Sequence, residues 1–144
     1  MSKDDNYGFK GNAPDNPKIN QMISFLYVGV AALNDGVISD NEIIQMVKKH
    51  ISYGMEKEDA FRLLDESIAW WNDAKGKDVH FEDLVQCAKH IKNHQAWNEN
   101  LKEMVHIDLT SITTADGLNN LDTGEFIGEH KLKVVNEIMK LFEN

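Results

Sequence analysis

Two turns of the chain carry acidic residues whose types and spacing could bind a cation. Asp35 and Glu42 flank the first turn, and Asp116 and Glu125 flank the second. Carboxylate oxygens suit Ca²⁺, Mg²⁺ or Mn²⁺ better than zinc. If the fold brings the turns together, each pair of carboxylates about 5 Å apart repels by roughly 3 kcal/mol at an effective dielectric near ~20, so the cluster needs a counter-charge. We therefore predict a divalent-cation site formed by these four residues.

A purely local explanation accounts for the same residues without a ligand. Asp side chains brace tight turns, and Ser39–Glu42 matches a capping box, in which Ser and Glu each satisfy a backbone N–H of the other. The stretch Asp122–Glu125 repeats this arrangement, and each cap contributes about 1 kcal/mol. In this interpretation the acidic turns only shape the fold.

The first turn also overlaps half of the calcium loop of EF-hands. Asp35 to Glu42 matches positions five to twelve of that loop, but positions one and three fall on Ala31 and Leu33, which offer no side-chain oxygen. In the second turn, the interval from Asp116 to Glu125 is two residues too long. The sequence therefore argues against a working EF-hand.

Other reactive side chains favour structural roles. His90 and His94 have a spacing that can hold zinc on one helix face, but the sequence shows no third ligand, and we expect both to be exposed. The single Cys87 shares a predicted helix face with Leu84 and Ile91, which indicates a buried apolar side chain rather than a nucleophile. It excludes an intramolecular disulfide and fits a reducing compartment.

No pattern in the sequence specifies an enzyme. The chain has neither a nucleophile elbow nor a glycine-rich phosphate loop, and Arg62 is its only arginine. A small metal-dependent hydrolase that uses the carboxylate cluster remains the alternative, and a plain helical scaffold without a ligand is a third possibility. We predict a non-enzymatic protein.

The composition limits the partners and the location of the protein. The 144 residues are 42% hydrophobic and carry a formal charge of −9, which disfavours nucleic acid and favours cations or basic protein surfaces. No apolar run approaches the roughly 20 residues that span a bilayer, and the N-terminus lacks a secretory signal. We expect a cytoplasmic protein that does not insert into membranes.

Apolar residues recur at three- and four-residue steps, which predicts an all-α fold. Residues 1–17 are predicted to be a flexible lead-in with Tyr7 and Phe9 at the surface, and residues 18–144 to form one compact domain of six to seven helices. Similar helix–turn–helix units near each end predict two pseudo-symmetric halves with the central helix pair between them. The expected inner-face residues include Ile51, Phe61, Phe81, Met104, Leu132 and Trp71, with Trp70 either at the core edge or on a contact surface.

The acidic turns also carry a family resemblance. Ala31-Ala32 leading into Asp35-Gly36 and Glu42, echoed by Ala115-Asp116-Gly117 and Glu125, resembles the TerB tellurite-resistance family over residues 18–142. The resemblance implies a compact helical fold that brings acidic residues together. Its acidic positions correspond to Asp35, Glu42, Asp116 and Glu125, with Asp122 as a weaker addition. It also implies a role in a cytoplasmic tellurite, metal or phage stress-response system, beside a membrane-embedded partner. The insert Leu118-Asn119-Asn120 departs from the family pattern and puts the equivalence of Glu125 with Glu42 in doubt.

Overall fold

The computed structural model describes residues 8–74, 76–117 and 128–143, and every regular element in these ranges is helical. The predicted all-α class is confirmed, whereas the pseudo-symmetry of the halves stays a prediction. In chain order the elements are α1 (Ile19–Asp35), α2 (Asp40–Ser52), α3 (Lys57–Asp73), α4 (Lys77–Lys92), α5 (Glu99–Thr113), α6 (Gly128–Lys140) and the 3₁₀ helix η2 (Leu141–Glu143).

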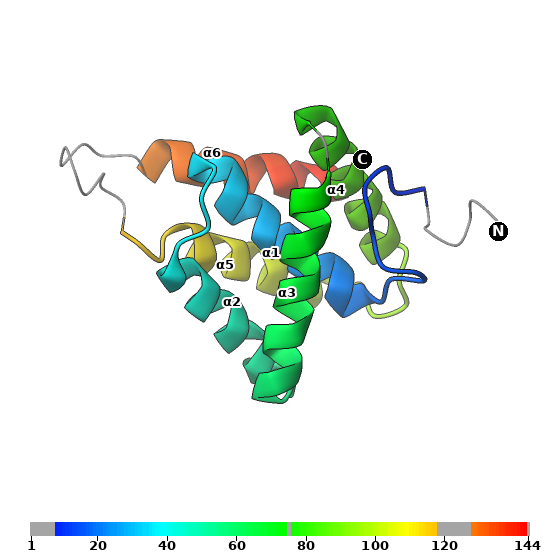
Figure 1. The fold of residues 1–144 in the computed structure, drawn as a ribbon, viewed down its shortest axis with the longest axis horizontal. Coiled ribbons are helices and arrows are strands. Elements are labelled where there is room, and N and C mark those ends of the chain that lie inside the picture. Colours follow the sequence, from blue (N-terminus) through cyan, green and yellow to red (C-terminus); the bar gives the residue numbers. More distant parts are fainter. Residues whose placement is uncertain (1–7, 75, 118–127, 144) are drawn as a thin grey trace.

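Helix α1 lies in the centre of the molecule and contacts each of the five other α-helices (Figure 1). Residues 25–28, 30 and 31 are fully buried, so this helix is enclosed on all sides rather than along one stripe. Tyr27, in the middle of this helix, is also completely buried. Helix α1 therefore occupies the middle of the fold, because its buried residues surround the helix axis.

Two glycines give α1 its length and its close packing. Gly36 ends the helix in the left-handed conformation, with a φ of 79°, and its N–H donates to the carbonyl of Ala32. At Gly29, an added Cβ would lie 3.0 Å from Leu84 Cδ2 and 3.2 Å from Trp71 Cζ3. The missing side chain thus lets α3 and α4 approach α1 closely.

Several predicted inner-face residues are exposed instead. Ile51 is 41% and Phe81 is 59% exposed, while His50 and Asp83 are buried on the same helices. The buried face of α2 and of α4 is therefore partly polar. It differs from the apolar face that the sequence pattern predicted for each helix. Phe61, Met104 and Leu132 were wrongly placed on inner faces in the same way.

The segment before α1 packs against the helices, contrary to the surface position expected for Phe9. The Phe9 ring is buried and meets the Trp70 ring edge-on, with 4.8 Å between ring centroids. Trp70 also stacks on Phe25 at 3.9 Å, while Trp71 stacks on His80 at the same separation. Trp70 is therefore part of the core rather than a contact surface, because the N-terminal segment covers it. Tyr7 lies outside the described residues.

The buried carboxylate of Asp83 holds this segment in place. It accepts hydrogen bonds from the backbone N–H of Lys10 at 2.6 Å, the N–H of Gly11 at 2.9 Å and Trp70 Nε1 at 3.0 Å. A Cβ added to Gly11 would lie 2.6 Å from the same carboxylate. Asp83 therefore joins α4, α3 and the N-terminal segment at one point.

Candidate functional site

The two acidic turns meet at the carboxylate of Asp116. Its oxygens accept hydrogen bonds from Ser39 Oγ at 2.5 Å and from Asn41 Nδ2 at 2.7 Å. Ser39 is the N-cap residue of α2, and Asp116 follows the C-terminal end of α5. Residues 75 or more positions apart in the chain are thereby joined.

The Glu42 side chain is part of the N-terminal cap of α2. Its Oε1 accepts from the backbone N–H of Ser39 at 2.8 Å, and Ser39 Oγ accepts from the N–H of Glu42 at 3.1 Å. This is the predicted capping box, and Glu42 is only 2% exposed. The carboxylate also lies at the positive end of the helix dipole, which stabilises its charge.

The remaining members of the predicted cation site lie beyond what the structure describes. Asp35 is the last residue of α1, but its side chain is outside the described part. Glu125 and Asp122 fall within the undescribed residues 118–127, together with the second predicted capping box. Among the described residues, no three His, Cys, Asp or Glu side chains are grouped so that they could hold a metal. The four-residue site therefore stays a prediction.

Lys131 supplies a positive charge beside the second turn, which sequence reasoning missed. Its Nζ donates to the carbonyl of Gly117 at 2.7 Å, and the side chain is almost fully buried. Gly117 directly follows Asp116 in the chain. In the sequence, Lys131 lies three residues before Val134 and four before Val135, and both valines are buried. This spacing places Lys131 on their helix face and was the signal for its burial.

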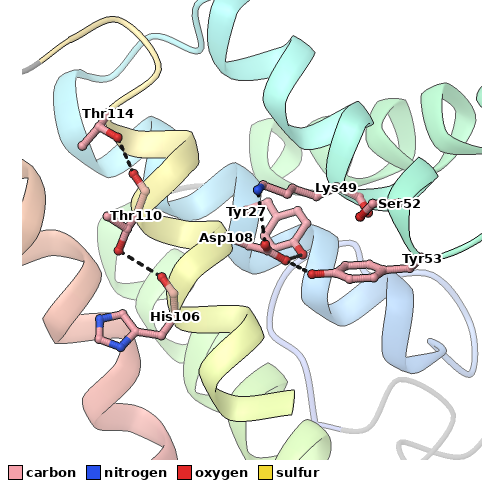
Figure 2. A network of polar contacts seen from close by, with 8 residues as sticks. All are labelled: Tyr27, Lys49, Ser52, Tyr53, His106, Asp108, Thr110 and Thr114. Carbon is pink, nitrogen blue, oxygen red and sulfur yellow. Dashed lines mark hydrogen bonds and ion pairs between the residues drawn. The ribbon is translucent and has the colours of Figure 1, made fainter. Parts of the chain in front are cut away.

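A second polar cluster, also missed, centres on Asp108 (Figure 2). The carboxylate accepts from Tyr27 Oη at 2.6 Å and from Tyr53 Oη, and it forms an ion pair with Lys49 Nζ at 3.6 Å. Asp108 is 4% exposed, so these partners replace the water that its charge would otherwise need. The cluster joins α1, the C-terminal end of α2 and α5. No spacing rule predicts it, because the partners of Asp108 lie 55 to 81 residues away from it in the chain.

The tyrosines of this cluster are neutral hydrogen-bond donors. Burial raises the pKa of Tyr27 far above its usual range, and the charge of Asp108 raises it further. Burial and the hydrogen bond to Asp108 raise the pKa of Tyr53 in the same direction. Neither phenol would ionise near neutral pH, so the arrangement suits the solvation of a buried carboxylate rather than nucleophilic catalysis.

His50, next to this cluster, should make folding stability depend on pH. Burial lowers the pKa of His50 from 6.5 to about 4, although the charge of Asp108 opposes this shift. Below pH 6.5 the unfolded chain therefore binds a proton that the folded protein does not, and the free energy of unfolding falls as the pH drops from 6.5 toward 4. We expect His50 to account for a loss of about 2 kcal/mol between pH 7.5 and 5.0.

Urea unfolding of the wild type and of His50→Leu at both pH values measures this loss. The variant should lose about 2 kcal/mol less than the wild type, because its residue 50 binds no proton. Ile51→Leu, at the exposed neighbouring position, serves as the control and should lose as much as the wild type, because it changes no titratable group. Equal losses in wild type and His50→Leu would contradict the assignment.

The sequence also singled out His90, His94 and Cys87 as reactive side chains. α4 ends at Lys92, so His94 lies beyond it and does not share a helix face with His90. His94 Nδ1 accepts instead from the N–H of Ala96 at 3.0 Å. Cys87 is fully buried as predicted, and burial raises the pKa of its thiol.

None of the helices in the described ranges has both the length and the apolar character to cross a membrane. The chain was also compared with protein-family models, with curated proteins and with solved structures, and no match was found in any of the three.

Proposed function

We propose that the protein is a non-enzymatic helical module that binds a protein partner, and that a divalent cation at the junction of its two acidic turns modulates this binding. The observation that carries the proposal is the contact of Asp116 with Ser39 and Asn41. It supports a shared location for the acidic turns, on which the cation hypothesis depends. The formal charge of −9 favours a partner with a basic surface.

The hydrogen bond between Ser39 and Asp116 gives a bound cation a way to affect partner binding. A cation bound by Asp35, Glu42, Asp116 and Glu125 would compete with Ser39 for the carboxylates of Asp116 and Glu42. Ser39 is the N-cap of α2, so a change in its hydrogen bonding would act on the start of that helix. In this proposal the cation sets the position of α2 relative to the end of α5. A role in a tellurite, metal or phage stress response, beside a membrane-embedded component, follows from the resemblance to the TerB family.

Calorimetric titration with Ca²⁺, Mg²⁺ and Mn²⁺ tests the cation site. We expect Asp116→Asn to weaken binding at least about ten-fold, since it removes a charged ligand, which corresponds to about 1.4 kcal/mol. Asp40→Asn is the matched control: Asp40 is an exposed carboxylate in the first turn of α2 and should leave the affinity unchanged. The absence of heat at millimolar metal with the wild type would refute the site.

Capture of partners with and without metal then tests the coupling. Metal-dependent capture that is lost in Asp116→Asn supports the proposal. Partner capture that is unchanged by metal and by Asp116→Asn would instead favour a plain helical scaffold. Metal-dependent turnover of generic phosphoesters would favour the hydrolase alternative.

A further inference from the structure

The outward face of α4 has an apolar centre between an acidic end and a basic end. The helix packs against α1 and η2 with its other sides. Along the outward face lie, in chain order, Asp78, Phe81, Glu82, Val85, Lys89 and Lys92. These six residues share one side of the helix, because they follow one another mostly at steps of three or four residues.

The apolar centre of this face is exposed and lies beside hollows in the surface. The Phe81 ring is largely exposed, and Val85 is half-buried. The larger of two hollows, about 530 Å³ in volume, is lined by Phe81, Val85, Lys89, Lys92, Asn93 and Leu141. A smaller hollow adjoins Phe81 and Val85 next to Glu82. An exposed aromatic ring next to a partly apolar hollow is a surface that gains free energy when a partner covers it.

The residues of this face are arranged symmetrically about Val85. Asp78 precedes Val85 by as many positions as Lys92 follows it, and the same holds for Phe81 and Lys89. In two antiparallel helices related by a two-fold axis at Val85, a residue before Val85 faces the residue equally far after Val85 on the second copy. The acidic end of each copy then lies opposite the basic end of the other. The face is therefore complementary to itself.

This antiparallel arrangement joins opposite charges and covers the exposed ring. Asp78 would face Lys92 of the second copy. Glu82 would lie beside Lys89 of the second copy, because their levels along the helix axis differ by one residue, or about 1.5 Å. The Phe81 ring of each copy would lie over the larger hollow of the other, against the aliphatic stems of its two lysines. Two parallel helices in register would instead place like charges together.

We propose that the protein forms a homodimer through the outward faces of two antiparallel α4 helices, with Val85 at the two-fold axis. One pair of helices buries less than the roughly 1,200 Å² of a standard interface, so we expect a dissociation constant on the order of 100 μM. The chain is then monomeric at the low micromolar concentrations of an unfolding experiment. The dimer does not depend on the function proposed above, because none of its residues belongs to the two acidic turns.

Exchanging the charges of Glu82 and Lys89 tests the pairing, with sedimentation equilibrium of the full chain as the measurement. Lys89→Glu creates a copy with a carboxylate at both positions, and Glu82→Lys creates a copy with a lysine at both. Each variant alone should dimerise at least about ten-fold more weakly than the wild type, because like charges then meet across the axis. An equimolar mixture should associate at least about ten-fold more tightly than either variant alone, since the mixed dimer restores both ion pairs.

Lys48→Glu is the matched control for these variants. Lys48 is exposed on α2, and its substitution gives the same net charge as Lys89→Glu. Its dissociation constant should stay within about two-fold of the wild type. The proposal is overturned if the wild type stays monomeric at millimolar concentration, or if the mixture associates no better than its components. Equal weakening by Lys48→Glu and Lys89→Glu would refute the proposed location.

Disulfide cross-linking tests the position of the axis. Val85→Cys should form an intermolecular disulfide under oxidising conditions, because the two copies of residue 85 face each other across the axis. Lys77→Cys is the control: it is exposed at the start of the same helix, but its two copies would lie about 24 Å apart and should not cross-link. The native Cys87 is fully buried and does not compete. Equal yields of cross-linked dimer from the two variants would refute an axis at Val85.

Discussion

Asp108→Ala is expected to lower the free energy of unfolding by about 3 kcal/mol. The substitution leaves the phenol of Tyr27, which is completely buried, without the acceptor that it now meets at 2.6 Å. A hydrogen bond to a charged group contributes about 1.5–3 kcal/mol, and an unsatisfied buried donor adds its desolvation cost. Lys49 and Tyr53 are more exposed and can turn to water, so most of the effect should come from Tyr27.

Urea unfolding of three further variants tests this assignment. Tyr53→Phe should cost less than about 1 kcal/mol, because Tyr53 is 48% exposed. Tyr27→Phe should destabilise the wild type, but in the Asp108→Ala background it should be neutral or stabilising, since it removes the unpaired hydroxyl group. An additive double mutant would show that the two side chains are not coupled.

Asp83→Ala is expected to lower the free energy of unfolding by about 3–5 kcal/mol. Three donors lose their common acceptor, and Trp70 Nε1 would stay buried without a partner. Because two of the donors are backbone groups of Lys10 and Gly11, the segment before α1 should also detach. Trypsin should then cleave after Lys10 many times faster than in the wild type.

The exposed neighbour Glu82 provides the control for this substitution. Glu82→Ala changes the same helix and removes the same kind of charge, but it should change stability by no more than about 0.5 kcal/mol and leave proteolysis unchanged. Cleavage after Lys10 that is equally slow in Asp83→Ala and Glu82→Ala would show that the carboxylate does not hold the segment.

Local patterns predicted the all-α class and the start of α2, but they did not predict which polar side chains are buried. Ser39 and Glu42 formed the expected capping box because both members lie within four residues of each other. By contrast, the burial of His50, Asp83 and Asp108 depends on contacts with other elements, and Tyr27 lies 81 residues from its acceptor. Apolar periodicity cannot show such pairs. It therefore placed Ile51 and Phe81 on the wrong side of their helices.

The four-residue cation site predicted from the sequence stays a prediction. The resemblance of the two turns implied that they meet, and Asp116 does reach Ser39 and Asn41. Whether Asp35 and Glu125 join them depends on side chains outside the described part of the structure.

The enclosed position of α1 has a consequence for synthesis of the protein. The ribosome makes this helix before every other helix that covers it, and α6, which also packs on it, emerges several seconds later at about 5–20 residues per second. During that interval the apolar side chains of α1 lack some of the helices that later cover them. Folding around α1 therefore cannot be completed before α6 has been made.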